Sequence, residues 1–391
     1  RAMAAAEGAS IAHWAAAAAA LLFGIAMLAW QWGAGRFSGW LDYSPSPGTT
    51  MGGVVEPETV RTAYIVNAAG TKSDEIAAMV GDRGWQVKPR MGEYILLHKD
   101  EGPKARHVLF PAPHPVYGKG CLVQSTLWGN LILGPTARDT MTLQPDGTLK
   151  PNEQVLREPQ DNILGWILSK SRQLVPSFDA GAVIHTFAGA RAKNTTGDWI
   201  IGPVAHAPGF INAASIDSPG IAASPAIAVD VVRMLAAEGA PVVRLDPDFN
   251  PNRAPLIVPK DGYKGLKMSK TEPWKTKDPR QNVVCKCERV TEAEVIEACR
   301  RSLPIDSTQA IRKRTRAGMG HCQGDPENYG CEERVAAIIA RETGCPIHEV
   351  GRRPFPASSL MRQRIFDERD RERLRKLSDP TREFNLHGAA A

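Results

Sequence analysis

The sequence predicts a protein of mixed α+β and α/β class with a single transmembrane helix, a partial domain built on an antiparallel sheet, and a small helical domain carrying cysteines. Three observations predict this organisation. A twenty-residue apolar stretch lies near the N-terminus, short apolar runs alternate with turn residues in the middle, and four cysteines gather near the C-terminus. At 391 residues the chain is long enough for two or three domains.

The apolar stretch at 11–30 contains one polar side chain, His13. Its length matches the ~20 residues that cross a bilayer core, whereas a secretory signal has an apolar region of ~7–15 residues. Tryptophans bracket the stretch as interfacial residues do. The alternative is a buried alanine-rich helix. Because the first residue is Arg1 rather than Met, we also expect a processed N-terminus from which a transit peptide was removed.

Changes in composition predict where the parts of the chain begin and end. Stretches rich in Ser, Pro and Gly, or in Pro and Lys, mark linkers, and a dense alternation of charges near the C-terminus marks a solvated arm. The predicted order is an N-terminal segment with the transmembrane helix (1–40), a linker (41–59), a domain of mixed strands and helices (60–240), which the resemblance given below implies is truncated, a linker (241–281), a helical domain (282–350) and a charged arm (351–391).

Within the truncated domain, Thr62–Gly70 is an apolar run that ends in glycine, and an amphipathic stretch follows at 74–80. This pattern predicts a strand, a tight turn and a helix. Helical periodicity returns at 163–174 and 225–237. Short apolar runs between turn residues predict strands at 93–98, 107–110, 121–125, 130–134, 183–188 and 199–201.

Charge and cysteine content narrow the classes of function. The net charge of +6 suits acidic partners or lipid, but no basic stripe is interleaved with aromatic residues, so we expect no nucleic-acid partner. Seven cysteines at uneven spacings favour a reducing compartment and metal ligation over a disulfide scaffold. The sequence shows no Ser-His-Asp arrangement and no His-x-x-x-His metal motif.

Four cysteines in two clusters are the candidate metal ligands, as a [2Fe–2S] cluster requires two thiolates for each iron. A single residue separates the first two, whereas zinc pairs usually leave two to four, so the spacing favours iron–sulfur over zinc. An empty site is the third alternative. Basic residues at 312–316 would offset the negative cluster and raise its potential. The four candidates are Cys285, Cys287, Cys322 and Cys331.

Several motifs in order support a resemblance: Asn67-Ala-Ala-Gly70, Lys88-Pro-Arg-Met-Gly-Glu-Tyr94, Gly129-Asn-Leu-Ile-Leu-Gly-Pro-Thr136 and the stretch 212–226. Together they resemble the FAD-dependent oxidoreductases of the D-amino-acid-oxidase superfamily, in particular the glycerol-3-phosphate-dehydrogenase-like branch. That branch often ends in a bacterioferritin-associated-ferredoxin-like (BFD-like) [2Fe–2S] domain, which the helical domain resembles. The resemblance implies a substrate-type sheet at about 85–190.

The resemblance also shows a departure, because the sequence contains no Gly-x-Gly-x-x-Gly turn for the FAD pyrophosphate. Two glycine strings, starting at Gly33 and Gly318, have the wrong spacing. We therefore expect the N-terminal half of the family's fold to be replaced by the membrane segment, so that FAD binding would need a partner chain. Eight residues separate Cys322 from Cys331 where the family usually has four. This insertion is either an outward loop or a sign of relaxed selection.

The resemblance implies two groups of functional residues. Small residues and a helix start would approach FAD at Ala68, Ala69, Gly70, Ser218, Pro219 and Gly220. Arg191 matches the arginine that grips an anionic substrate, because a guanidinium binds carboxylate or phosphate through two parallel hydrogen bonds. The alternative for Arg191 is a structural role, paired with Asp198 or another acid. Ser215 replaces the family's usual glycine and would crowd a flavin.

Three functions remain open. The first is an accessory, non-catalytic subunit of a mitochondrial inner-membrane complex of the respiratory chain, with a possible [2Fe–2S] cluster. The second is half of a split FAD-dependent dehydrogenase that oxidises glycerol 3-phosphate or a 2-hydroxy acid and passes electrons through the cluster to quinone. The third is an electron-transfer or assembly module alone. All three predict tightly bound protein subunits as partners, because a half domain exposes strand edges and apolar faces.

Overall fold

The computed structural model describes residues 49–50, 53–54, 61–113, 120–152, 160–241, 248–250, 252, 257, 260, 278–301, 305–324, 330–353 and 368–379. The predicted transmembrane segment at 11–30 lies outside the described residues. So do most of the predicted linkers, apart from isolated residues and the short strands β1 (Thr49–Thr50) and β2 (Gly53–Val54), which pair with each other.

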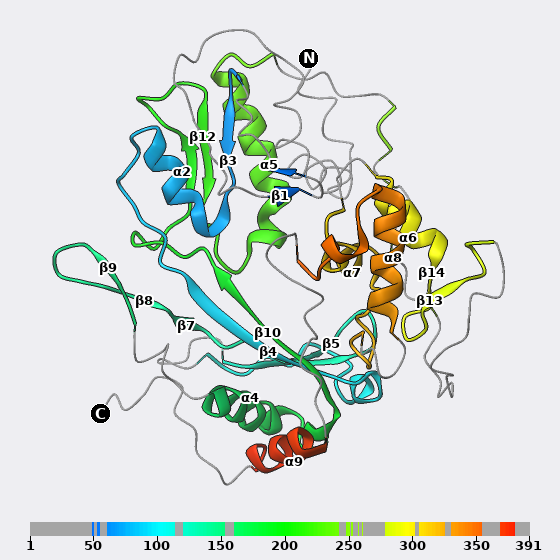
Figure 1. Ribbon diagram of the computed structural model, residues 1–391. Coiled ribbons are helices and arrows are strands. Elements are labelled where there is room, and N and C mark those ends of the chain that lie inside the picture. Colours follow the sequence, from blue (N-terminus) through cyan, green and yellow to red (C-terminus); the bar gives the residue numbers. More distant parts are fainter. Residues whose placement is uncertain are drawn as a thin grey trace.

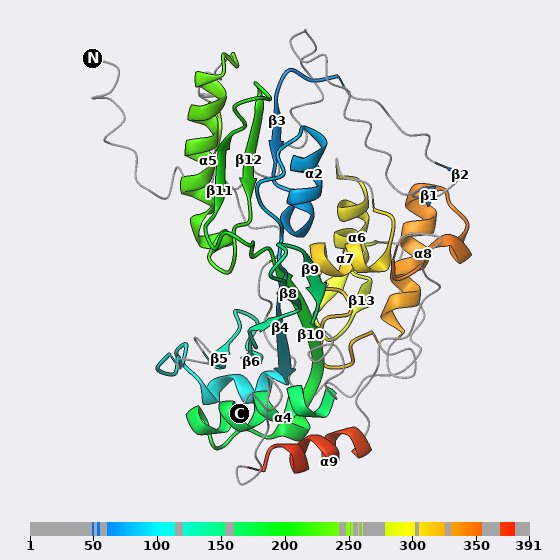
Figure 2. The same cartoon turned by 90° about the vertical axis from the view of Figure 1, so that its left-hand side faces the viewer.

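A three-stranded sheet forms the upper part of the molecule in Figure 1, in the order β11-β12-β3. Its strands are β3 (Ile65–Asn67), β11 (Ile200–Pro203) and β12 (Phe210–Ala214), and β3 runs parallel to β12. Helix α2 (Ser73–Met79) covers one face and α5 (Gly220–Ala237) covers the other (Figure 2). All five residues of β12 are therefore buried, as expected for a strand covered on both faces.

A larger antiparallel sheet lies below, in the order β10-β4-β6-β5, with β7 (Arg138–Asp139) also paired to β4. Its main strands are β4 (Arg90–Leu97), β5 (Leu122–Ser125), β6 (Leu131–Gly134) and β10 (Val183–Arg191). The long strands β4 and β10 reach toward the small sheet in Figure 1. A hairpin of β8 (Met141–Leu143) and β9 (Leu149–Pro151) extends from β7.

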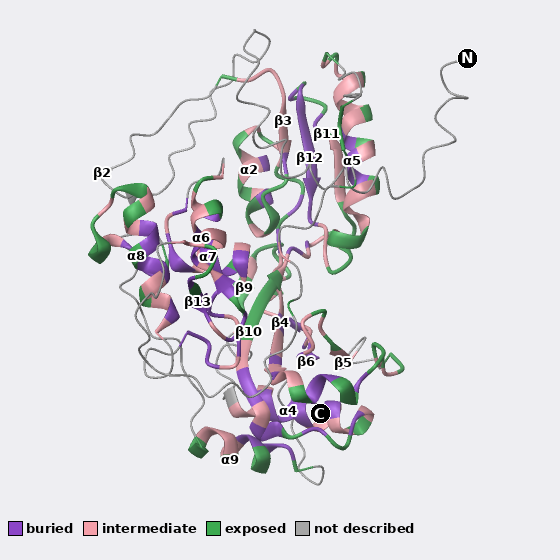
Figure 3. Cartoon of the chain, turned by 90° about the vertical axis from the view of Figure 1, so that its right-hand side faces the viewer, coloured by how far each residue is buried: buried purple, intermediate pink, exposed green. Residues whose placement is uncertain are grey.

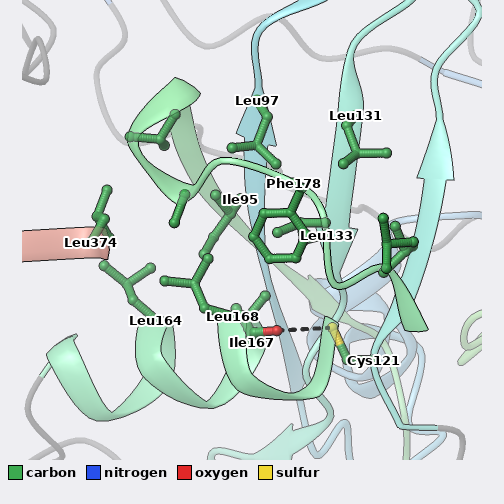
Figure 4. Close-up of a cluster of buried hydrophobic side chains, with 14 of the residues drawn as sticks. Ile95, Leu97, Cys121, Leu131, Leu133, Leu164, Ile167, Leu168, Phe178 and Leu374 are labelled. Carbon is green, nitrogen blue, oxygen red and sulfur yellow. Dashed lines mark hydrogen bonds between the residues drawn. The ribbon is translucent and has the colours of Figure 1, made fainter. Parts of the chain in front are cut away.

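The core of this part lies between the large sheet and α4 (Gln160–Leu174) (Figure 4). Ile95 and Leu133 from the strands meet Ile167 from the helix, and all three are fully buried. The Cys121 thiol packs in the same core and contacts the Ile167 carbonyl oxygen. Cys121 is thus a core residue, and burial raises the pKa of its thiol to about 11.

The charged arm predicted at 351–391 is not simply solvated. Helix α9 (Glu368–Leu377) packs beside α4, with Leu374 and Leu377 buried on one face. Spaced three residues apart, these two leucines form the apolar stripe that a docked helix needs. Polar contacts hold the helix to neighbouring segments: Arg371 donates to the Gly181 carbonyl, Arg373 and Arg375 pair with Asp161 and Asp179, and Arg172 donates to Ser378 Oγ.

We expect Leu374→Ala to lower the free energy of unfolding by about 2–3 kcal/mol, because it removes buried side-chain volume and leaves a cavity. Chemical denaturation of the full chain followed by circular dichroism measures this change. Lys376→Ala is the matched control on the same helix, because the Lys376 side chain is 73% exposed; a change within about 0.5 kcal/mol is expected there. Equal effects of the two variants would show that α9 is not docked.

The cysteine-bearing part folds as a small helical domain, coloured yellow and orange in Figure 1. Its helices are α6 (Glu292–Cys299), α7 (Thr308–Thr315) and α8 (Cys331–Thr343), and its short strands are β13 (Val283–Cys285) and β14 (Val290–Thr291). Local signals explain these bounds. Thr291 and Glu294 form a capping box before α6, and Gly344 ends α8 in the left-handed conformation.

Two sequence predictions differ from the structure. The strand predicted at 107–110 forms only an isolated bridge between Leu109 and Val123. Strand β12 was not predicted, because its buried residues show no alternation of apolar and polar side chains (Figure 3). Among the described residues α5 alone has the length and hydropathy of a membrane span, with a mean hydropathy of 1.5. Core helices meet the same criterion, and α5 packs on the small sheet.

Candidate functional site

The structure brings the four candidate metal ligands together inside the small helical domain. Cys285 ends β13, Cys287 lies in the following turn, Cys322 lies in the loop after α7, and Cys331 begins α8. Each is at most 5% exposed. The sulfurs of Cys287 and Cys322 are 3.4 Å apart, and the Cys285 thiol is hydrogen-bonded to that of Cys331. The site is therefore two pairs of thiols in one buried cluster.

Glycines allow the loop at 318–324 to close over these thiols. A side chain at Gly320 would lie 2.2 Å from Cys287 Cβ, a distance that real atoms do not reach. The Gly318 amide donates a hydrogen bond to Cys285 Sγ at 3.3 Å, and its φ of +84° suits glycine. The insertion before Cys331 lies largely outside the described residues, but Cys331 itself still reaches the site.

The thiols differ in acidity. Hydrogen bonds from Cys331 and from the Gly318 amide lower the pKa of Cys285 to about 7. The pKa values of Cys287 and Cys331 are raised, first by their hydrogen-bonded partner thiols and then by burial. Four thiolates thus need a bound cationic centre. Two pairs of thiols match the two thiolates that each iron of a [2Fe–2S] cluster takes.

Of the basic residues at 312–316, Arg312 lies nearest the thiols. It lines a cavity beside Cys331, and its Nη2 donates to Gln323 Oε1 at 2.6 Å. Burial lowers the pKa of Arg312 to about 10, while the nearby Cys331 and Cys285 act in the opposite direction. Its direct hydrogen-bond acceptors are uncharged. The Glu332 carboxylate lines the same cavity and raises the pKa of Arg312, as do the nearby cysteines, so Arg312 is a buried cation beside the thiol cluster.

A second candidate site lies where β3 and β12 end side by side. Asn67 and Asn212 are register partners, and the Asn67 amide donates to Asn212 Oδ1 at 2.8 Å. The sequence Asn-Ala-Ala occurs at both positions, and the residue that follows it has a positive φ in each case: +59° at Gly70 and +54° at Ser215. Two matching turns therefore leave the carboxyl edge of the small sheet, which is the usual ligand edge of parallel strands.

These turns carry the residues predicted to approach FAD. The first turn exposes Ala68, Ala69 and Gly70, and the second turn leads through Ser218 and Pro219 to Gly220, where α5 begins. The long helix α5 thus begins at this edge and directs its positive N-terminal end toward it. Ser215 Oγ and Asp217 Oδ1 are buried without a hydrogen-bond partner in the part of the chain that the structure describes. Such unpaired polar atoms fit a ligand at this edge, so Ser215 offers a hydrogen-bonding group as well as bulk.

The third candidate site is the face of the large sheet turned away from α4. Gly92 of β4 lies directly opposite Gly189 of β10, which leaves this part of the sheet without side chains. On one side of the gap Tyr94 stacks on Phe187, with ring centroids 4.9 Å apart. On the other side lies Arg191, whose guanidinium approaches Gly92 so closely that a Cβ there would clash. The Arg191 guanidinium thus covers Gly92, and the bare part of the sheet is at Gly189, between the aromatic pair and the cation.

Backbone carbonyls rather than an acid hold Arg191. Its Nη1 lies 3.4 Å from the carbonyl oxygens of Met91 and Thr136, and in the described part of the chain it pairs with no carboxylate. The predicted alternative partner, Asp198, instead accepts a hydrogen bond from the Trp199 amide. The remaining guanidinium donors are therefore available to an anion.

His185 continues the aromatic row beside Phe187, and burial lowers its pKa to about 4, with Arg312 and Arg352 adding repulsion. The unfolded chain therefore binds more protons than the folded chain between about pH 4 and 6.5. This stability contribution is complete above pH 6.5 and is lost as the pH falls toward 4, by about 2–3 kcal/mol in total.

We expect His185→Gln to flatten the acid limb of the unfolding free energy relative to the parent chain. Denaturant titrations at a series of pH values between 4 and 7.5 measure this difference. His107→Gln, at an exposed histidine, is the control and should leave the curve unchanged. Parallel curves for His185→Gln and the parent would contradict a buried neutral histidine.

Comparison with known proteins places these sites in a family. Residues 9–234 match the model of the FAD dependent oxidoreductase family, which is more than half of the chain. The chain belongs to the FAD dependent oxidoreductase family. Residues 283–341 match the BFD-like [2Fe-2S] binding domain, which includes all four candidate cysteines. The oxidoreductase match begins before 11–30, so it includes the segment predicted to cross a membrane.

Relatives of this oxidoreductase are glycerol 3-phosphate enzymes. Glycerol 3-phosphate dehydrogenase of Caloramator mitchellensis is 34% identical over 298 residues, which cover 76% of this chain and 58% of that protein. Glycerol 3-phosphate oxidase of Mycoplasma genitalium is 27% identical, covering 49% of this chain and 47% of that one. The chain thus spans about half the length of the curated relatives it matches.

Among solved structures, the dithionite-reduced L-alpha-glycerophosphate oxidase from Mycoplasma pneumoniae with FAD bound is similar over 44% of this chain and 42% of that one. The sequence identity is 27% and the TM-score is 0.35. The family assignment therefore depends on the sequence matches. These matches confirm the predicted combination of an FAD-dependent oxidoreductase domain with a BFD-like domain, and with it the predicted cofactor classes, FAD and [2Fe–2S]. They favour the dehydrogenase alternative over the non-catalytic subunit.

Proposed function

We propose that this chain is the substrate-binding and cluster-bearing part of an FAD-dependent dehydrogenase that oxidises glycerol 3-phosphate. A 2-hydroxy acid is the related substrate class that the same cation would accept. The observation that carries the proposal is Arg191, a guanidinium with no acid partner among the described residues, which lies over Gly92 beside the open sheet surface at Gly189. Two relatives are glycerol 3-phosphate enzymes by name.

The chain's own residues have separate tasks in this reaction. Arg191 binds the anionic group of the substrate and sets its register along β10. Gly92 leaves room for the Arg191 guanidinium, Gly189 lets the carbon chain lie against the backbone, and the Tyr94–Phe187 pair closes the other end of the site. Bound FAD would supply two-electron oxidation of the alcohol, and a cluster held by the four cysteines would supply one-electron transfer toward an acceptor such as quinone. The turns after β3 and β12 hold the flavin edge.

The pyrophosphate-binding half of the FAD site comes, in this proposal, from a partner chain or from residues beyond this sequence. The predicted location in the mitochondrial inner membrane and the predicted protein partners stay predictions. Deletion of residues 11–30 is the first test of the membrane location. If these residues anchor the protein, the shortened protein should leave the membrane fraction on carbonate extraction. Unchanged retention would contradict the anchor.

The proposed function is tested on the protein purified with whatever chains accompany it. Anaerobic addition of glycerol 3-phosphate should bleach the flavin absorbance and produce the electron-paramagnetic-resonance signal of a reduced [2Fe–2S] cluster. Glycerol without phosphate is the control and should act poorly, because Arg191 then has no anion to bind. Flavin and cluster that both stay oxidised with every phosphorylated or carboxylated alcohol would support the non-catalytic subunit instead.

A further inference from the structure

The cluster domain meets one end of the large sheet through several residues of the oxidoreductase part, among them Lys99 and Trp128, and the rings of His98 and His321 also meet there edge to face. Lys99 begins the short helix η2 (Lys99–Lys104), and its Nζ lies 3.1 Å from Glu288 Oε1 of the cluster domain. Trp128 lies in the turn between β5 and β6, and the Arg316 guanidinium carbon is 4.0 Å from its ring centroid. The contact therefore joins an ion pair to a cation–π interaction.

Arg316 takes part in both halves of this contact. Its Nε lies 2.9 Å from Glu288 Oε2, while its guanidinium covers the face of Trp128. The Glu288 carboxylate thus lies between Arg316 and Lys99, and its side chain is only 4% exposed. Glu288 also follows Cys287 directly in the sequence. The contact consequently reaches the cysteine-bearing turn itself.

The backbone of Arg316 is unusual for an arginine. It follows the last turn of α7 with a φ of +71°, the left-handed conformation that usually selects glycine at this position. Helix α8 ends in the same way, at Gly344 with a φ of +75°. A residue with a side chain here carries a backbone cost that its contacts must offset, and such residues gather at functional sites.

The surface that receives Arg316 is rigid. The turn at 126–130 is closed by backbone hydrogen bonds between Thr126 and Asn130 and from Gly129 to Thr126. Gly102 packs so closely on the Gly129 carbonyl that a Cβ would overlap it. These contacts hold the turn that carries Trp128 in place. A guanidinium stacked on the Trp128 ring is therefore held in one position relative to the large sheet.

We propose that Arg316 is a positioning residue that docks the [2Fe–2S] domain on the substrate-binding sheet in one orientation. Arginine is present at this left-handed position because its side chain joins Glu288, beside Cys287, to Trp128 on the sheet. A lysine would supply charge without the planar face that stacks on the indole. The docking follows from these contacts alone, whereas its role in electron transfer rests on the proposed function.

Arg316→Gly in the full chain tests the proposal, because glycine suits the backbone and removes only the side-chain contacts. Arg289→Gly is a closely matched control: Arg289 also has a positive φ, +53°, but it is exposed and its side chain contacts no partner among the described residues. Hydrogen–deuterium exchange of peptides covering 122–134 and 283–291 is the readout. We expect both peptides to exchange at least tenfold faster in Arg316→Gly than in the parent chain. In Arg289→Gly we expect the exchange rates of the parent chain.

Trp128→Ala should reproduce the change in the 283–291 peptide, and the double variant should add little to either single one. Equal exchange in Arg316→Gly and Arg289→Gly, or additive effects in the double variant, would overturn the docking role. In the holoenzyme, Arg316→Gly should slow reduction of the cluster by glycerol 3-phosphate at least tenfold while flavin bleaching keeps its rate. If the parent protein reduces neither centre, the proposed function fails, and the exchange data still decide the docking.

Discussion

Cys322→Ser is expected to abolish the iron–sulfur cluster, reducing bound iron from about two atoms per chain to almost none. A serine hydroxyl is far less acidic than a thiol and is a poor ligand for iron of this kind. Because the four sulfurs lie in the core of the small helical domain, losing the cluster also removes the cross-link between the β13–β14 turn and α8. Iron and acid-labile sulfide analysis, together with visible absorbance, measures the loss.

The matched control for this experiment is Cys345→Ser in the same domain. Cys345 is half-buried near the end of α8, where it accepts a hydrogen bond from Thr343 Oγ1, and it lies outside the thiol cluster. The Cys345→Ser protein should retain iron and sulfide at the level of the parent protein. A Cys322→Ser protein that keeps a full complement of iron would contradict ligation by this residue. Bound zinc in place of iron, both in the parent protein and in the Cys345→Ser control, would favour the zinc alternative.

The sequence predicts the cysteine site better than the other two candidate sites, because the ligand pattern lies in short, local stretches of the chain. The Cys-x-Cys pair occupies one tight turn after β13, and the glycine-rich loop at 318–324 has to pass close to it. The spacing of the final pair is less informative, because the position of Cys331 depends on where α8 begins rather than on loop length. The structure shows that a helix start can return this thiol to the site despite the insertion.

Other features depend on contacts between distant segments, and sequence reasoning did not find them. The pairing of Asn67 with Asn212 joins two Asn-Ala-Ala turns, and their repetition in the sequence was the available signal. For Arg191 the sequence left open anion binding and a structural pairing with Asp198 or another acid, whereas its contacts are backbone carbonyls of β4 and of the residues after β6. The docking of Arg316 on Trp128 has no local signature, since a positive φ at an arginine is visible only in the structure.

Arg191→Gln is expected to lower kcat/KM for glycerol 3-phosphate by about 10- to 150-fold, which corresponds to the ~1.5–3 kcal/mol of a hydrogen bond to a charged group. Most of the loss should appear in KM if the arginine grips the phosphate equally in the ground state and the transition state. Arg191→Lys should recover part of the loss, because it restores charge without the paired donors. Steady-state assays with an artificial electron acceptor measure both parameters.

Arg233→Gln on α5 is the control, since that side chain is 75% exposed and pairs only with Asp230. Its kinetics should match those of the parent protein. The comparison of substrates adds a second criterion: Arg191→Gln should discriminate less between glycerol 3-phosphate and glycerol, because the removed interaction belongs to the anion alone. If both substrates lose activity equally, Arg191 supports the sheet through Met91 and Thr136 and does not bind the anion, which would move the substrate site away from the open sheet surface at Gly189.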